Sequence, residues 1–294
     1  MTSPWWLDRT ETCFTWDLWY SCNYRCPYCW WEMDGLWDRL AGQNRILKPA
    51  EWKRVWDGVA DSCGPLRLDI LGGEPLLYPE SGDVLRSLSE RHKIVVSTNL
   101  SIEPAELGDM DPGRVHFNAS FHPEFSRLDE FLPKVLGLKA RGFEPGVVLV
   151  AWPPFLGRVD GYRRSFVSQG IPFSLMVFQG RYAGKEYPES YTPRERAILS
   201  DCIRDEGERS FRVGRSSTRG RPCHAGRVYA NVKGDGTVYS CGQDAFSRKP
   251  LGNILDPGFK LHPSARPCPY EHCSCQEYEY LEEVMRACTH PAGS

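Results

Sequence analysis

The order of apolar and amphipathic stretches along the first 180 residues is the feature that most constrains the fold. Six stretches have the length and apolar character of buried strands: residues 12–20, 66–71, 93–98, 114–121, 147–152 and 171–178. Three stretches between them carry apolar residues at helical spacing: residues 49–60, 83–91 and 128–141. Strands that alternate with helices pair in parallel through right-handed crossovers. The sequence therefore predicts an α/β fold, a partial (β/α)6 barrel, because a complete eightfold barrel usually needs ~250 residues.

The pattern changes after residue 178. Residues 179–191 are rich in glycine, tyrosine and charge, and we expect them to form a connector. Thr192 and Glu195 have the spacing of a capping box that opens a helix. The stretch RVYANVKGDGTVYSC predicts a β-hairpin that turns at residues 234–236, and residues 277–287 predict a helix. We therefore expect two domains, a barrel at 12–185 and a small C-terminal α+β domain at 186–294.

Charge and hydropathy narrow the possible partners. The net charge is -2, which gives no reason to expect nucleic acid as a partner. No apolar run approaches the ~20 residues of a membrane span, and the first residues lack the pattern of a secretion signal. We therefore expect a cytoplasmic protein without a membrane partner. In such a protein, twelve cysteines indicate metal binding rather than disulfides.

The first group of cysteines is Cys22, Cys26 and Cys29, with the spacing C-x3-C-x2-C. It follows the first predicted strand directly, and loops at the carboxyl ends of parallel strands build active sites. Three thiolates favour zinc or an iron–sulfur cluster. The alternatives are a zinc site with a remote fourth ligand, or reduced cysteines without metal. A cubane cluster held by only three cysteines leaves one iron open to another ligand.

A second motif, Gly72-Gly73-Glu74-Pro75, ends the second predicted strand. Two glycines allow a ligand to approach the backbone closely, and we expect their N–H groups to be bare. A carboxylate directly after them can hold an ammonium group. Alone, this motif indicates an ordinary turn; next to the cysteine loop, it is the second part of one site.

These two motifs together resemble those of the radical S-adenosylmethionine (radical SAM) enzymes. The order of predicted strands and helices resembles that family over residues ~12–180, and the specific match lies in the two motifs. It implies that the three cysteines hold a 4Fe–4S cluster whose open iron binds S-adenosyl-L-methionine. It further implies that Tyr28 lies against the adenine and that the glycine–glutamate motif contacts the methionine amino group. Three residues at later strand ends match positions that hold the carboxylate or ribose of this cofactor: Ser97, Asn99 and Ser120.

The second group of cysteines lies near the C-terminus. Cys223 and Cys241 have the C-x(9–15)-G-x4-C spacing that resembles the auxiliary-cluster (twitch/SPASM) extension of radical SAM enzymes. One auxiliary 4Fe–4S cluster needs four ligands, and Cys268, Cys273 and Cys275 are three candidates for two places. The chain departs from the short form of the extension, because it ends in C-x4-C-x-C instead of C-x2-C. A zinc ribbon made of the same thiolates is the alternative.

The implied reaction is hydrogen abstraction by a 5′-deoxyadenosyl radical, after reduction by a donor such as flavodoxin or ferredoxin. The resemblance assigns no catalytic side chain, and the candidates are Cys63 and Cys202 as hydrogen-atom donors and His122. We expect a small polar substrate, a sugar or aminocyclitol that is epimerised or dehydrogenated, because little chain precedes residue 12 to recognise a peptide. The alternatives are a ribosomal peptide delivered by a separate protein, or a non-catalytic zinc-binding scaffold.

Overall fold

The computed structural model describes residues 11–200, 216–273 and 276–289. Its main sheet has nine strands in the order β12-β11-β10-β1-β2-β3-β4-β5-β6. The first six strands in sequence are β1 (Thr12–Trp19), β2 (Leu66–Gly72), β3 (Lys93–Thr98), β4 (Val115–Ser120), β5 (Gly146–Val150) and β6 (Phe173–Met176). Each of them pairs in parallel with the next. The predicted partial (β/α)6 barrel is confirmed, and each strand lies within two residues of its expected position.

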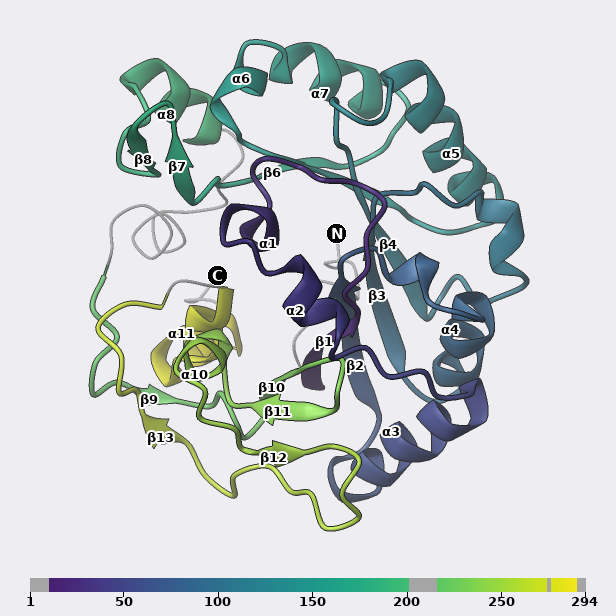
Figure 1. Cartoon of the computed structure of the whole chain (residues 1–294), viewed down its shortest axis with the longest axis vertical. Coiled ribbons are helices and arrows are strands. Elements are labelled where there is room, and N and C mark those ends of the chain that lie inside the picture. The colour runs from purple at the N-terminus through teal and green to yellow at the C-terminus, as the bar shows by residue number, and fades with distance from the viewer. Residues whose placement is uncertain (1–10, 201–215, 274–275, 290–294) are drawn as a thin grey trace.

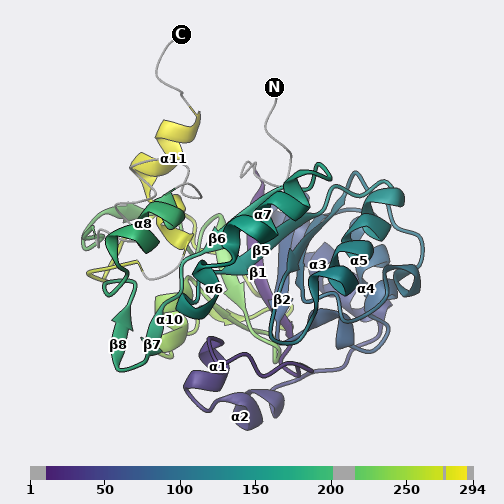
Figure 2. The same cartoon turned by 90° about the horizontal axis from the view of Figure 1, so that it is seen from above.

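The helices between the strands form an outer arc along one face of the sheet (Figures 1 and 2). They are α3 (Pro49–Cys63), α4 (Ser81–Ser89), α5 (Leu128–Ala140), α6 (Pro153–Leu156) and α7 (Val159–Val167), with the short 3-10 turns η2 (Pro75–Leu77) and η3 (Pro104–Leu107). The sequence did not predict α6 or α7, because the VDGYRRSFV stretch of α7 has only three apolar residues apart from its tyrosine.

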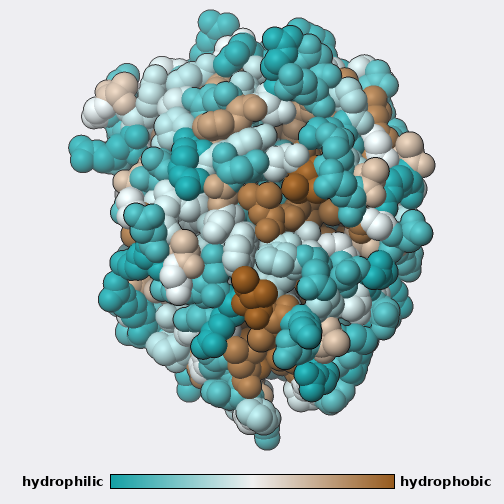
Figure 3. All heavy atoms as spheres, turned by 45° about the vertical axis from the view of Figure 1, so that its right-hand side comes forward, coloured by the Kyte–Doolittle hydropathy of each residue, from teal (hydrophilic) through white to brown (hydrophobic). Residues whose placement is uncertain are grey.

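Aromatic residues join this outer arc to the sheet. The Trp16 ring on β1 lies 4.6 Å from that of Trp52 and 5.1 Å from that of Trp56, both on α3. All three side chains are fully buried. Burying side chains of this size stabilises the fold by about 2–3 kcal/mol each, so this contact fixes α3 against the strand that precedes the cysteine loop. Seen from the helix side, the surface is mainly hydrophilic with small apolar areas (Figure 3).

The C-terminal part adds three strands to the same sheet. Strand β10 (Tyr229–Val232) pairs in parallel with β1, and β11 (Thr237–Tyr239) pairs antiparallel with β10, as the predicted hairpin requires. Strand β12 (Gly252–Asn253) follows at the edge. The expected domains at 12–185 and 186–294 therefore share one continuous sheet, since β10 covers the edge that β1 would otherwise expose.

Smaller elements complete the chain. The expected connector contains a two-stranded hairpin, β7 (Gly180–Tyr182) and β8 (Lys185–Tyr187), so the expected boundary at residue 185 cuts through it. Helix α8 (Pro193–Ser200) begins at the predicted capping box, where the side chains of Thr192 and Glu195 hydrogen-bond each other. The predicted helix at 277–287 is instead the 3-10 turn η4 (Gln276–Tyr280) followed by α11 (Glu282–Thr289). The remaining elements are α1 (Trp30–Met33), α2 (Trp37–Ala41), β9 (Pro222–Cys223), α10 (Gly242–Phe246) and β13 (Arg266–Pro267).

The face of the sheet opposite the outer helices is mixed, with many polar residues. In a parallel sheet, directly paired residues point to the same face, and the pairing register places nine polar residues on this inner face: Thr15, Asp17, Arg67, Asp69, Ser97, His116, Asn118, Ser120 and Asn231. The same register places Cys13, Leu71, Val95 and Val148 there as well. Helices α1 and α2 lie at one end of the sheet, beyond the end of β1 (Figure 2). No helix in the described residues combines the length and the apolar character needed to cross a bilayer.

Candidate cofactor and metal sites

The first cysteine loop leaves β1 and turns back tightly on itself. The Cys29 N–H donates to the Cys26 carbonyl at 2.9 Å, and the Arg25 guanidinium donates to the Cys22 carbonyl at 2.6 Å. Cys29 is the residue from which α1 begins, and its carbonyl accepts from the N–H groups of Glu32 at 3.1 Å and Met33 at 2.9 Å. These bonds hold the three thiols in one short loop, as the spacing predicted. Cys26 is buried, and Cys22 and Cys29 are half-buried.

Burial raises the pKa of all three thiols, that of Cys26 to about 12. Each thiolate would also repel its neighbours, so a bound cation is needed to hold the group ionised. Among the described residues, no three Cys, His, Asp or Glu side chains gather closely enough to hold a single metal ion. An iron–sulfur cluster accepts wider spacing, because each thiolate binds a different iron. Three thiols on one short loop are a donor set that fits an iron–sulfur cluster.

His122, which follows β4, lies against this loop. Its Nδ1 is 2.8 Å from the Tyr28 hydroxyl and 3.4 Å from the Cys26 sulfur. Burial lowers the pKa of His122 to about 4, so the imidazole is neutral at physiological pH. Tyr28 packs its ring against Trp152 and Phe155. The sequence analysis gave His122 as a catalytic candidate. In the structure, His122 contacts Cys26, a predicted metal ligand, and Tyr28, which is predicted to lie against the adenine.

The glycine motif brings two backbone segments into contact. A Cβ on Gly72 would lie 2.3 Å from the Trp19 carbonyl oxygen, and one on Gly73 would lie 2.4 Å from that of Tyr20. The Gly73 N–H donates to Trp19 and the Glu74 N–H to Ser21. The expectation of a bare N–H group is therefore wrong at Gly73, and the bonds of Gly73 and Glu74 together hold the end of β2 against the start of the cysteine loop.

Glu74 is almost completely buried beneath this contact. Its carboxylate accepts hydrogen bonds from the Thr98 hydroxyl at 2.7 Å, the Asn99 N–H at 2.7 Å and the Leu76 N–H at 3.0 Å. Burial raises its pKa to about 7 although all three bonds favour the ionised form. The carboxylate thus ties the end of β2 to the end of β3. A carboxylate has about four acceptor positions, which leaves one for a further donor.

The three polar residues predicted at later strand ends have different surroundings. Asn99 donates its side-chain N–H to Asn23 at 3.0 Å and lies 4.0 Å from the Cys22 sulfur, so it borders the cysteine loop directly. Ser97 and Ser120 are half-buried on the inner face of the sheet. Neither serine hydroxyl has a hydrogen-bond partner among the described residues. Both are thus available to a ligand within the curve of the sheet.

The second cysteine group converges on one cavity. Cys223, Cys241, Cys268 and Cys273 all line it, although they are distributed over 51 positions of the chain. Burial raises the pKa of Cys223 to about 11 and that of Cys241 to about 12. Cys275 lies outside the described residues. Four thiols on one cavity are the number that closes a cluster, in contrast to the three of the first loop.

A hydrogen-bonded link that the sequence did not predict connects this cavity to the inner face of the sheet. Glu277 lines the cavity and accepts from the Gly242 N–H and from the Tyr229 hydroxyl, each at 3.1 Å. The same hydroxyl lies 3.0 Å from that of Thr15 on β1. Nearby, Lys233 pairs with the buried Asp17 at 2.7 Å. Pairing of β10 with β1 creates both contacts, and no local sequence signal predicts that pairing.

Of the two candidate hydrogen donors, only Cys63 lies in the described residues, and its position does not support that role. Cys63 is exposed at the C-terminus of α3, where its thiol donates to the Val59 carbonyl. That helix end leads into the first residue of β2, so Cys63 lies at the end of the sheet opposite the first cysteine loop. Cys202 lies outside the described residues.

Comparisons with known proteins rest on structure. No protein-family model matches the chain, and no curated protein matches it in sequence. Streptococcus suis SuiB superimposes with a TM-score of 0.61 at 14% identity over 84% of this chain, and this match spans 64% of SuiB, less than two thirds of that protein. The structure of SuiB bound to S-adenosylmethionine superimposes with a TM-score of 0.60. Native anSMEcpe with bound AdoMet and the Cp18Cys peptide superimposes with a TM-score of 0.56 at 15% identity, and the match covers 94% of this chain and 96% of anSMEcpe. The chain therefore has the radical SAM type of (β/α) fold.

Proposed function

We propose that this protein is a radical SAM enzyme that carries a second, auxiliary 4Fe–4S cluster in its C-terminal part. The observation that carries the proposal is the convergence of three parts at one edge of the sheet. Asn99, at the end of β3, joins the other two parts by hydrogen bonds: its N–H donates to the buried Glu74 at the end of β2, and its side chain donates to Asn23 of the three-cysteine loop. When bound, a 4Fe–4S cluster supplies the electron that cleaves S-adenosylmethionine, and the resulting 5′-deoxyadenosyl radical abstracts a substrate hydrogen.

The residues of the chain have distinct tasks in this proposal. Cys22, Cys26 and Cys29 hold the first cluster, and His122 orients Cys26 and Tyr28. Glu74 receives the methionine ammonium group on its remaining acceptor position, with Gly72 and Gly73 holding that segment close. Tyr28, Ser97, Asn99 and Ser120 contact the rest of the cofactor. The half-buried serine hydroxyls support this assignment, since they lack partners within the described chain.

Cys223, Cys241, Cys268 and Cys273 are the proposed ligands of the auxiliary cluster. Their shared cavity supports four-cysteine ligation, and Cys275 is then surplus. The competing zinc scaffold requires thiolates that meet at one ion with Zn–S distances near 2.3 Å. The described residues present no such group, which favours clusters at both sites.

We propose that the substrate is small, polar and carbohydrate-like, and that it binds within the curve of the sheet. A flavodoxin or ferredoxin is the proposed electron donor that reduces the first cluster. The polar residues of the inner face support this class, because hydroxyl and amide groups there match a substrate rich in hydroxyls. Hydrogen abstraction then leads to epimerisation or dehydrogenation. A peptide substrate, which the peptide-bound anSMEcpe structure suggests, is the other outcome of the test.

The deciding experiment is anaerobic reconstitution of the full chain. We expect about eight irons and eight acid-labile sulfides per chain, and 5′-deoxyadenosine when S-adenosylmethionine and dithionite are added. Colourless protein with about two zinc ions would overturn the enzyme proposal. A screen of deuterated sugars, aminocyclitols and peptides, scored by deuterium in 5′-deoxyadenosine, identifies the substrate class. Transfer from peptides alone would overturn the carbohydrate assignment and leave the enzyme class intact.

A further inference from the structure

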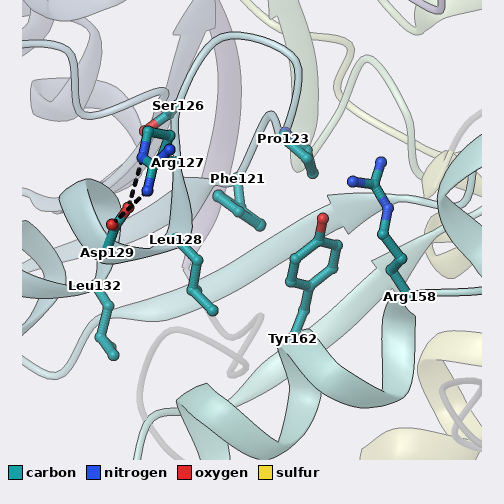
Figure 4. Close-up of a pocket in the computed structure, with 9 residues that line it drawn as sticks. All are labelled: Phe121, Pro123, Ser126, Arg127, Leu128, Asp129, Leu132, Arg158 and Tyr162. Atoms are coloured by element: carbon teal, nitrogen blue, oxygen red, sulfur yellow. Dashed lines mark hydrogen bonds and ion pairs between the residues drawn. The ribbon is translucent and has the colours of Figure 1, made fainter.

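A cavity of about 550 Å³ lies outside the barrel, between α5 and α7. Figure 4 shows Phe121 at its floor, with residues of α5 on one side and residues of α7 on the other. The volume falls within the range of ~300–1,000 Å³ of small-molecule sites. Its apolar lining is made of Phe121, Pro123, Leu128, Leu132 and the ring of Tyr162.

One side of the cavity carries polar groups that the chain does not satisfy. The guanidinium of Arg158 lies over the Tyr162 ring, 5.8 Å from its centre, and has no hydrogen bond or ion pair within the described residues. The Tyr162 hydroxyl and the Ser126 hydroxyl also have no partner there. In Figure 4 the Tyr162 hydroxyl and the Arg158 guanidinium point toward the same end of the cavity, next to Pro123.

The opposite side differs, because its cation is already paired. Arg127 forms two hydrogen bonds with the Asp129 carboxylate, at 3.0 and 2.7 Å. The cavity therefore offers one guanidinium, that of the exposed Arg158, which forms no hydrogen bond or ion pair within the described residues. Glu124 also lies near Arg158, since the positive charge of Arg158 lowers its pKa against the rise that burial causes. Two carboxylates around the cavity disfavour a doubly charged phosphate, whereas one guanidinium matches one planar carboxylate.

The segment 121–127 separates this cavity from the cofactor loop and contacts both. Phe121 and Pro123 face the cavity, whereas His122 contacts Cys26 and Tyr28. Phe125 stacks on Tyr24 of the cysteine loop, with ring centres 4.8 Å apart and planes inclined by 13°. The cavity is therefore distinct from the proposed cofactor site and shares one wall with it.

We propose that this cavity is a second ligand site, which binds a small monocarboxylate with an aromatic or aliphatic body. The carboxylate pairs with Arg158 and accepts a hydrogen bond from Tyr162, while the body lies on Phe121, Leu128 and Leu132. This assignment uses none of the proposed cluster ligands, so it stands or falls independently of the proposed function.

The test measures binding of 3-phenylpropanoate to the reconstituted full chain by isothermal titration calorimetry, with 3-phenylpropanamide as the uncharged probe. Wild-type protein is expected to bind the carboxylate about tenfold or more tighter than the amide, as a charge-assisted hydrogen bond implies. Arg158→Gln should remove that preference. Arg127→Gln is the matched control on the same cavity, and it should change the affinity less than about twofold because Arg127 is already paired.

A second variant separates binding from folding. Tyr162→Phe keeps the ring and removes only the hydroxyl, and it should weaken carboxylate binding severalfold without lowering the melting temperature by more than a few degrees. Absence of saturable binding by wild-type protein, equal affinity for acid and amide, or equal losses in the Arg158 and Arg127 variants would each overturn the proposal.

Discussion

The two cysteine sites are built in opposite ways. The first places Cys22, Cys26 and Cys29 on one tight loop, and the surrounding strands contribute the neighbours Asn99 and His122. The second draws Cys223, Cys241, Cys268 and Cys273 to one cavity from separate segments of the C-terminal part. The first therefore depends on local chain geometry and has an incomplete ligand set, whereas the second depends on tertiary folding and has a complete one.

This difference indicates that the first site is the one that can accept a ligand from outside the chain. In the proposed function, a loop with three thiols would leave one iron of its cluster unligated, and the nearby Glu74 retains one acceptor position for a further donor. The four-thiol cavity is instead closed by the chain itself, and Glu277 and Tyr229 fill its boundary toward the sheet. Under the proposed function, this contrast assigns the reaction to the first site and a supporting role to the second.

The largest effect is expected when the reactive site loses a ligand. Cys26→Ala should abolish 5′-deoxyadenosine formation and reduce iron from about eight to about four per chain, because only the auxiliary cluster remains. Cys63→Ala is the control, since Cys63 is exposed at the far end of α3 and should retain full activity. Full iron content in the Cys26 variant would contradict the assignment of this thiol.

The auxiliary site is tested by two cysteines that are close in sequence. Cys273→Ser should lower iron to about four per chain, with the first cluster retained, because Cys273 lines the cavity. Cys275→Ser should leave about eight. Iron analysis with Mössbauer spectroscopy distinguishes these outcomes, and the reverse pattern would transfer the fourth ligand position to Cys275.

His122 is expected to have an intermediate effect as a positioning residue. His122→Leu removes the polar contact with Cys26 and Tyr28, and losses of 10–100-fold in activity are usual for groups that orient metal ligands. The midpoint potential of the first cluster, measured by redox titration with EPR detection, should shift as well. His122→Asn, which keeps a polar atom near the Nδ1 position, should restore part of the lost activity and part of the shift in midpoint potential. His116, which is buried on β4 and bonded to Asn118, is the control position.

Glu74 gives a pH-dependent prediction. Its folded-state pKa of about 7 exceeds the ordinary value of 4.5, so the folded protein binds this proton more tightly than the unfolded chain does. The stability that results is fully present below pH 4.5 and is lost as pH rises through 7, by about 3 kcal/mol. Glu74→Gln removes this dependence. Denaturant titrations at pH 5, 6.5 and 8 should therefore show the stability advantage of wild type over Glu74→Gln shrinking as pH rises, whereas the exposed Glu106→Gln should show no such trend.

The smallest effect is expected at the link between the two sites. Tyr229→Phe removes the hydroxyl that joins Glu277 to Thr15 and should cost about 1–2 kcal/mol in the free energy of unfolding. Denaturant titration measures this loss, and both clusters should remain. A loss of auxiliary iron in this variant would show that the link is part of the ligand environment instead.

The sequence predicted the six strands well, because residues such as Phe14, Trp16 and Leu68 alternate with polar residues, as in a strand that buries one face. It also predicted both cysteine groups. It missed the pairing of β10 with β1, and therefore the contacts of Lys233 with Asp17, because strand order depends on tertiary packing rather than local pattern. The sequence also gave the wrong role for the glycine motif, for a related reason. The close neighbour that requires glycine at position 72 is the carbonyl of Trp19 on β1, and the spacing of residues does not reveal that contact.

The pairing of β10 with β1 also constrains how the chain reaches its final state. Strand β1 is made first, yet one of its two neighbours is made near the end; Lys233 follows its partner Asp17 by 216 positions. Until that hairpin arrives, the edge of β1 beside the cysteine loop is unpaired, and contacts so distant in sequence form slowly. The reactive loop is therefore held by a complete sheet only after the segment that carries the second cysteine group has folded.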